Sequence, residues 1–228
     1  MAQTGANIPD PAGGGSEPTR KYYANRRDDM LPFLPARYTR VLEVGCGEGA
    51  FAALLAPGSE VWGVEPDPVS AARAATRLHR VCAGAYTQVA GQLPDAYFDL
   101  VICNDVIEHM VEPEEFLVSM RRKLAPDGHV IASIPNMRHW ETLFELLWKK
   151  DWRYRQSGTL DRTHLRFYTQ KSIERLFTES GFVIERIAGI NEPRHPWRRL
   201  ALLLLSALTL GYYADVRFPQ FALRAGLK

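Results

Sequence analysis

The chain has 228 residues, of which 46% are hydrophobic and 24% charged, and this is enough for one domain with a full hydrophobic core. Its formal net charge of +2 is too small to indicate a nucleic-acid-binding surface over the whole molecule, so nucleic acid is not an expected partner. Three cysteines, an odd number, do not make a disulfide framework, which favours a cytoplasmic protein.

Residues 1–19 are rich in glycine, proline and serine and predict a disordered N-terminal tail. They contain neither a charged n-region nor an apolar h-region, so we expect no secretory signal. Residues 20–228 are expected to form the single folded domain.

From residue 21 onward, short apolar runs alternate with longer helical stretches, which is typical of a parallel sheet covered by helices on both faces. The first half is expected to contain, in order, a helix over 22–33, the strand RVLEV, a glycine turn, the helix FAALLA, the strand EVWGVE, the helix PVSAARAATRLH and the strand RVCAG. The second half is expected to contain the strand FDLVIC, the helix PEEFLVSMRRKL, a turn at 126–128, the strand GHVIASIP, the helix KSIERLFTES closed by a glycine, the strand FVIERIAGI, an apolar helix and a strand near 220–225. This order predicts an α/β fold whose first five strands are parallel.

A glycine-rich turn follows the first strand, in the segment VLEVGCGEG at residues 41–49. Gly45, Gly47 and Gly49 lack a Cβ, so backbone N–H groups there can approach a ligand at the start of the next helix. Glu65 at the end of the second strand is placed to hold a ribose diol. Both features suit NAD as well as S-adenosylmethionine (SAM), and a turn without any ligand is the third possibility.

Glu43, two residues before the turn, favours SAM over NAD. A carboxylate in this crevice suits the cationic amino-acid end of SAM and would repel a pyrophosphate. The residues expected to bind the cofactor are Glu43, Gly45, Cys46, Gly47, Gly49, Glu65, Pro66, Tyr86 and Asn104.

The segments VLEVGCGEG, VEPD at 64–67 and FDLVICNDVIEHM at 98–110 resemble class I SAM-dependent methyltransferases in order and spacing. The resemblance covers nearly all of residues 39–190. It implies a Rossmann-like, doubly wound, mostly parallel seven-stranded sheet with an antiparallel last strand, the glycine turn near the methionine moiety, and Glu65 on the ribose hydroxyls. Where many relatives carry an acidic residue for adenine, this chain has Gly84, Ala85 and Tyr86, which leaves adenine recognition open.

A narrower resemblance lies in DVIEHM, SIPNMRHW and GTLDRTHLRFYT at 158–169, which are similar to methyltransferases encoded among bacterial polysaccharide-biosynthesis enzymes. It implies O-methylation of a sugar hydroxyl in a glycan, nucleotide sugar or lipid-linked saccharide. The alternatives are a quinone, phenolic or natural-product hydroxyl, an RNA 2′-hydroxyl, and a SAM-binding protein without catalysis. A purely structural cap with ion pairs inside residues 161–166 would also explain the last segment.

The segment DVIEHM follows the fourth strand, at the sheet edge where ligands bind in open α/β folds. If this turn is helical, Asp105, Glu108 and His109 share one face, and His164 follows in the narrower motif. Small-RNA 3′-end 2′-O-methyltransferases use a similar cluster to hold a divalent ion, and ubiquinone-pathway O-methyltransferases have similar motifs. We therefore expect these four residues to hold Mg²⁺ or Mn²⁺ or, without metal, Glu108, His109 and His164 to act as an acid-base group. Two histidines hydrogen-bonded in the core are the remaining interpretation.

Residues 136–168 are expected to form a lid over the acceptor, with basic residues that suit a phosphorylated acceptor and tryptophans that pack mostly into the core. Residues 196–213 are expected to form an apolar helix insertion that is too short to span a bilayer. Burial or homodimer formation is the first expectation for this insertion. Peripheral contact with the inner face of a membrane is the alternative, which gains weight if the acceptor is lipid-linked.

Overall fold

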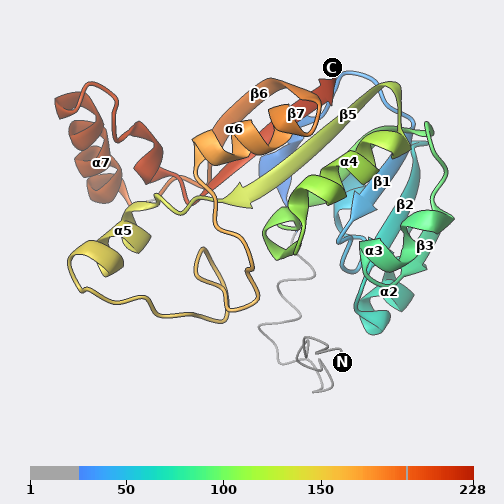
Figure 1. The fold of residues 1–228 in the computed structure, drawn as a ribbon, viewed down its shortest axis with the longest axis horizontal. Helices are drawn as coiled ribbons and strands as arrows, with labels where there is room; N and C mark the ends of the chain where they lie inside the picture. Colours follow the sequence, from blue (N-terminus) through green and yellow to red (C-terminus); the bar gives the residue numbers. More distant parts are fainter. Residues whose placement is uncertain (1–25, 194) are drawn as a thin grey trace, which may run out of the picture.

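The computed structural model describes residues 26–193 and 195–228, which form a seven-stranded sheet with helices on both faces (Figure 1). The strand order is β3-β2-β1-β4-β5-β7-β6. The expected tail at 1–19 and the start of the expected helix at 22–33 lie outside the described residues. The rest of that helix is a single 3-10 turn, η1 (Asp28–Phe33), which contains a proline.

The sheet confirms the predicted arrangement of parallel and antiparallel strands. The parallel strands are β1 (Arg40–Val44), β2 (Glu60–Glu65), β3 (Arg80–Ala83), β4 (Phe98–Asn104) and β5 (Leu124–Pro135). The last strand, β7 (Gln220–Leu227), runs antiparallel between β5 and β6 (Phe182–Ile190). The apolar central strands are buried on both faces, as a doubly wound sheet requires.

Six α-helices and several 3-10 turns connect the strands of the described chain. The helices are α2 (Pro68–Ala74), α3 (Tyr86–Val89), α4 (Pro113–Lys123), α5 (Trp140–Leu147), α6 (Gln170–Glu179) and α7 (Pro196–Leu208). Local sequence sets their ends: the Asp67 side chain caps α2 by accepting from the Ser70 N–H, and Thr169 caps α6 through Ser172. Gly181, with φ of 85°, follows α6 as predicted.

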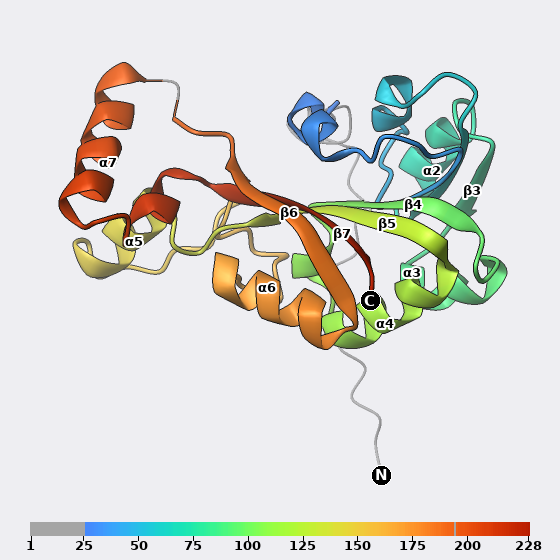
Figure 2. The same ribbon diagram turned by 90° about the horizontal axis from the view of Figure 1, so that it is seen from above.

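Helices lie on both sides of the sheet (Figure 2), and an apolar core fills the space on each face. One core contains the inner sides of α3, α4 and α6, including Phe116 and Phe177. The other contains η1, α2 and the 3-10 turn η2 (Phe51–Leu54), with Met30 and Phe51 against the strands. Both cores pack against the parallel strands, whose carboxyl ends meet at one edge of the sheet. The candidate site lies at that edge.

Three local expectations were wrong. The segment FAALLA forms only η2, because the chain reaches Pro57, and the residue before a proline disfavours helix. The helix α2 ends at Ala74, and the chain then turns so that His79 Nδ1 accepts the Val61 N–H of β2 at 3.0 Å. The expected turn at 126–128 lies inside β5, at an irregularity where Phe98 pairs with Leu124 but Leu100 pairs with His129.

Beyond the carboxyl edge of β5, the chain leaves the sheet and forms an end region. This region contains α5, the irregular segment 148–169 and α7, which lie together at one end of the molecule in both ribbon views (Figures 1 and 2). The side chain of Arg198 in α7 links it to α5, with an ion pair to Glu141 at 3.8 Å. No described helix is long and apolar enough to cross a bilayer.

Candidate active site

The glycine turn after β1 is held against the end of β2 by backbone hydrogen bonds. The N–H groups of Gly45 and Cys46 both donate to the Val64 carbonyl, at 2.8 and 3.2 Å. Gly45 has φ of 70° and Gly47 has φ of 53°, a backbone region that favours glycine. A Cβ added at Gly45 would lie 2.8 Å from Cγ2 of Val106, so this position also needs the space that glycine leaves.

Glu65, at the end of β2, binds this turn directly. Its Oε2 accepts the Gly47 N–H at 2.8 Å, and its Oε1 accepts the Asp67 N–H at 2.9 Å. Burial raises the pKa of Glu65, and these two hydrogen bonds act in the opposite direction. Glu65 thus orders the glycine turn as well as standing where a ribose is expected.

Glu43 lies beside it as a buried carboxyl group with one oxygen unsatisfied. The residue is 5% exposed, and its Oε2 has no hydrogen-bond partner among the residues that the structure describes. Burial raises the pKa of Glu43 to about 8, and the charge of Glu65 adds to the shift. A buried acid without a partner at this edge is suited to a cationic ligand group.

The other expected cofactor residues divide into two groups. Asn104, at the end of β4, has both side-chain amide atoms buried without partners in the described chain, and Cys46 is buried under the turn. Pro66 is exposed. Tyr86, however, packs into the core on α4: its ring lies edge-on to Phe116 with centroids 4.8 Å apart, and its hydroxyl lies 3.1 Å from Ser119 Oγ. Its side chain therefore has its partners on α4.

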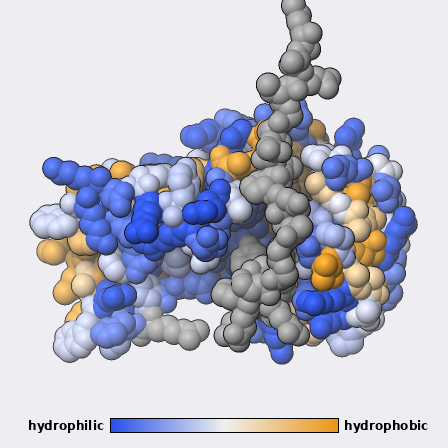
Figure 3. All heavy atoms as spheres, turned by 90° about the horizontal axis from the view of Figure 1, so that it is seen from below, coloured by the Kyte–Doolittle hydropathy of each residue, from blue (hydrophilic) through white to orange (hydrophobic). Residues whose placement is uncertain are grey.

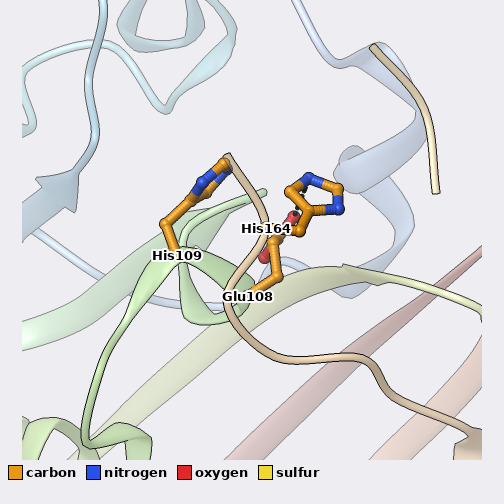
Figure 4. A group of neighbouring side chains, drawn as sticks. All are labelled: Glu108, His109 and His164. Carbon is orange, nitrogen blue, oxygen red and sulfur yellow. Dashed lines mark ion pairs between the residues drawn. The ribbon is translucent and has the colours of Figure 1, made fainter. Parts of the chain in front are cut away.

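Glu108, His109 and His164 form a second group of polar side chains (Figure 4). One ligand atom of each lies within 4.8 Å of the others. Glu108 and His109 belong to the 3-10 turn η4 (Ile107–His109), which follows β4. The N–H groups of Leu165 and Arg166 donate to the Glu108 carbonyl at 2.9 and 3.0 Å, so the 158–169 segment is bound to η4 and carries His164 to the group.

The carboxylate of Glu108 is the most buried part of this group. The residue is 1% exposed, and neither side-chain oxygen has a hydrogen-bond partner in the described residues. Nε2 of His164 lies 3.9 Å from Oε1 of Glu108. Burial raises the pKa of Glu108 well above its ordinary value, and the negative charge of Asp105 raises it further. Burial lowers the pKa of His164.

Both imidazole rings are oriented by backbone carbonyls. His109 Nδ1 lies 3.1 Å from the Thr163 oxygen, and His164 Nδ1 lies 3.1 Å from the Thr159 oxygen. A carbonyl accepts only from a protonated ring nitrogen, so this network assigns the proton of each neutral ring to Nδ1. The Nε2 atoms then carry lone pairs for a metal ion or a proton, the arrangement that metal-binding histidines commonly have.

Asp105 is not part of this group, contrary to the expected common face. It has φ of 54° and precedes η4, so no helical turn aligns it with Glu108. Its carboxylate forms an ion pair with Arg27, and its Oδ1 accepts from Gln220 Nε2 at 2.7 Å and from Ser133 Oγ at 3.1 Å. These partners favour the charged form of Asp105, whereas burial acts more strongly in the opposite direction and raises its pKa.

A cavity of about 310 Å³ adjoins the Glu108 group. One wall comes from Glu141, Thr142 and Glu145 of α5, and another from residues 157–161, so part of the expected lid does line a cavity. The α5 wall was not identified from the sequence, although the spacing of these three residues on one helical face is a signal for it. The expectation that the lid tryptophans pack in the core is wrong for Trp148 and Trp152, which are exposed.

Comparison with known proteins agrees with this architecture. Residues 17–187 match the family described as a methyltransferase domain. A SAM-dependent methyltransferase structure from Archaeoglobus fulgidus superposes with a TM-score of 0.63 at 19% identity, covering 91% of this chain and 94% of the other. One from Mesorhizobium loti gives a TM-score of 0.61 at 17% identity, covering 87% and 95%.

Curated relatives match over a shorter region. The mitochondrial ubiquinone biosynthesis O-methyltransferase of Schizosaccharomyces pombe is 30% identical over 132 residues, which are 53% of this chain and 48% of that protein. The ubiquinone biosynthesis O-methyltransferase of Alkalilimnicola ehrlichii is 36% identical over 116 residues, 47% of this chain and 46% of that one. The chain thus spans about half the length of these relatives. With the family match over most of its length, the chain belongs to the methyltransferase-domain family, and it has the fold of the SAM-dependent methyltransferases of known structure.

Proposed function

We propose that the protein O-methylates a phenolic hydroxyl that has a second oxygen on the neighbouring ring carbon. The observation that carries this proposal is the convergence of Glu108, His109 and His164 within 4.8 Å beside the cavity. This group lies at the same sheet edge as Glu43 and Glu65, which are expected to hold SAM, so a donor and an acceptor can meet there.

The group fits a divalent cation. Glu108 has two buried oxygens without partners, and both histidines are oriented so that Nε2 is available. Two imidazoles and one carboxylate suit Mn²⁺ better than Mg²⁺, which prefers oxygen ligands. When bound, such an ion lowers the pKa of a hydroxyl that it contacts.

The residues of the chain also supply a proton acceptor. Transfer forms a bond between the acceptor oxygen and the methyl carbon of SAM and breaks the carbon–sulfur bond, so that S-adenosylhomocysteine leaves. Where no cation occupies the group, the hydroxyl proton goes to Nε2 of His164, because burial lowers the pKa of His164 and keeps the ring neutral. Where both Nε2 atoms hold a cation, these lone pairs are occupied, and the hydroxyl proton then leaves to water. The segment 158–169, bound to Glu108, orients the acceptor and excludes water.

The names of the relatives favour a phenolic acceptor over the sugar hydroxyl that we expected first from the sequence. Several of them are ubiquinone biosynthesis O-methyltransferases. A phenol has a pKa of about 10, as tyrosine does, whereas an alcohol is a weaker acid, so a histidine accepts the phenolic proton more readily. The sugar remains the second candidate, because most of the residues that line the cavity have polar side chains, including Glu141, Ser157 and Thr159.

Transfer assays with labelled SAM test the proposal. We expect methylation of a catechol bearing an apolar tail, with EDTA abolishing transfer and Mn²⁺ restoring it. The matched phenol with a single hydroxyl should react poorly because it cannot offer two neighbouring oxygens. Methylation of a nucleotide sugar or lipid-linked saccharide instead of the catechol would select the second candidate, and equal rates with the single-hydroxyl phenol would contradict the role of the neighbouring oxygen.

A further inference from the structure

The helix α7 and the turn after it expose an apolar surface that the fold does not cover. No residue of α7 is buried, and Leu208 and Leu210 are 83% and 98% exposed. The leucines exposed along this segment are Leu200, Leu203, Leu204, Leu205, Leu208 and Leu210. The expected burial of this helix is therefore wrong for the chain by itself. We call residues 196–213 the apolar segment.

Aromatic and basic residues flank these leucines. Trp197 at the start of the apolar segment and Tyr212 near its end are 74% and 71% exposed. The side chains of Arg198 and Arg199 are each 61% exposed. They form ion pairs at 3.8 and 3.2 Å with Glu141 and Glu192, which lie outside the apolar segment, and the segment itself contains no acidic residue. Leucines between aromatic and basic residues are typical of a helix lying in a membrane interface, where the cations meet anionic lipid head groups.

The neighbouring helix α5 continues this surface at the same end of the molecule. Leu147 and Trp148 at its end are 73% and 77% exposed. Figure 3 shows apolar side chains at the end of the molecule where α5 and α7 lie, beside a strongly hydrophilic surface. The same helix lines the candidate acceptor cavity with Glu141 and Glu145, so the exposed surface and the cavity share one element.

We propose that the apolar segment docks on the surface of an anionic lipid bilayer, with α7 lying in the interface and Arg198 and Arg199 among the head groups. Positive charge without any acid within the segment favours anionic lipid over a second copy of this chain, because an identical segment offers no acidic residue to pair with Arg198 and Arg199. Docking places the α5 wall of the cavity close to the bilayer. An acceptor with an apolar tail can then enter the cavity from the membrane. This consequence rests on the proposed function, whereas the docking itself is independent of it.

Vesicle sedimentation with the full chain tests docking without SAM or acceptor. We expect binding to vesicles of equal parts phosphatidylglycerol and phosphatidylethanolamine, and much weaker binding to phosphatidylcholine alone. Leu204→Glu combined with Leu208→Glu should lower the vesicle affinity by roughly tenfold or more, because two leucines no longer enter the apolar layer. Val118→Glu on α4, where the valine is 49% exposed compared with 54% for Leu204, is the matched control and should bind like wild type.

Circular dichroism and SAM binding of the double variant should match wild type, which separates lost docking from lost folding. The proposal is overturned if wild type does not bind the anionic vesicles or if the double variant binds them equally well. It is also overturned if wild type does not bind vesicles and is a dimer in sedimentation velocity while the double variant is a monomer. The apolar segment is then a self-association surface. Glu108→Gln should lose methyl transfer and keep vesicle binding, so the two proposals fail separately.

Discussion

Glu65 joins the two parts of the candidate cofactor site, because its carboxylate binds the glycine turn at the strand end where a ribose is expected. We expect Glu65→Ala to weaken SAM binding at least tenfold, since each charge-assisted hydrogen bond contributes about 1.5–3 kcal/mol and two of them order Gly47 and Asp67. Isothermal titration calorimetry measures this. Glu60→Ala at the opposite end of the same strand is the control, and an unchanged dissociation constant for Glu65→Ala would place the ribose elsewhere.

The glycine turn gives a second residue-scale prediction. Gly47→Val should abolish SAM binding, because a β-branched residue is strongly strained at φ of 53° and its side chain occupies space beside the ligand. Equilibrium dialysis with labelled SAM checks this. Gly91→Ala, where an added Cβ meets nothing within 4 Å, should bind normally. Retained binding by Gly47→Val would remove the turn from the cofactor site.

Variants of the group at η4 should distinguish binding of the methyl donor from transfer of the methyl group. His164→Gln and Glu108→Gln should each reduce the rate of transfer at least a hundredfold while leaving SAM affinity nearly unchanged, because the group is expected to contact only the acceptor. His129→Gln is the control, since this histidine pairs with Glu185 on the sheet. A matching loss of SAM affinity in either variant would show that the group holds the cofactor.

Sequence reasoning located Glu43 and Glu65 because the carboxyl ends of parallel strands meet at one edge of the sheet. It grouped Glu108 and His109 by their spacing after the fourth strand and added His164 only through a resemblance, since no local pattern shows that a loop 54 residues further along the chain docks on η4. It misplaced Asp105, whose backbone conformation and pairing with Arg27 depend on residues distant in the sequence.

At the scale of elements, periodicity and capping signals located α4, α6 and β6 closely. The helix α6 has a capping box in which the Ser172 N–H donates to Thr169 Oγ1. Thr169→Ala should lower the free energy of unfolding by about 1 kcal/mol, measured by urea denaturation. Thr178→Ala, whose hydroxyl only donates to carbonyls within the same helix, should have a smaller effect. Equal effects would mean that the cap does not fix the start of α6.

The elements that sequence reasoning placed poorly are those whose form depends on partners. The segment 148–169 contains little regular structure and is held by hydrogen bonds to η4 and by ion pairs such as that between Arg155 and Glu145. No apolar period could reveal these contacts. The segment FAALLA has helix-forming residues but ends as the short 3-10 turn η2, because Pro57 follows it directly.

At the scale of the whole molecule, the two cores hold the sheet, and the end region built from α5, 148–169 and α7 is added at its carboxyl edge (Figure 1). The sheet residues in both cores alternate as the strand pattern requires, so the sheet was predictable. The exposure of α7 was not, because an apolar helix is buried in most soluble folds and only the packing of the other elements shows that no core is left for it.

We expect the unsatisfied Glu43 carboxyl to couple cofactor binding to proton release. With a pKa of about 8 in the free protein, the group carries a proton at neutral pH, and the amino-acid cation of SAM favours the ionised form. Binding below pH 8 should therefore release up to one proton, and affinity should rise by at most about tenfold per pH unit up to that pH. The free energy of unfolding of the ligand-free protein should correspondingly fall as pH rises from 4.5 towards 8, because the pKa of Glu43 is higher in the folded state than in the unfolded state. Calorimetry in phosphate and in Tris, whose heats of ionisation differ, tests this release of a proton. The two buffers should give different apparent binding enthalpies for wild type and nearly equal ones for Glu43→Gln. Equal buffer dependence in both proteins would show that the proton comes from another group.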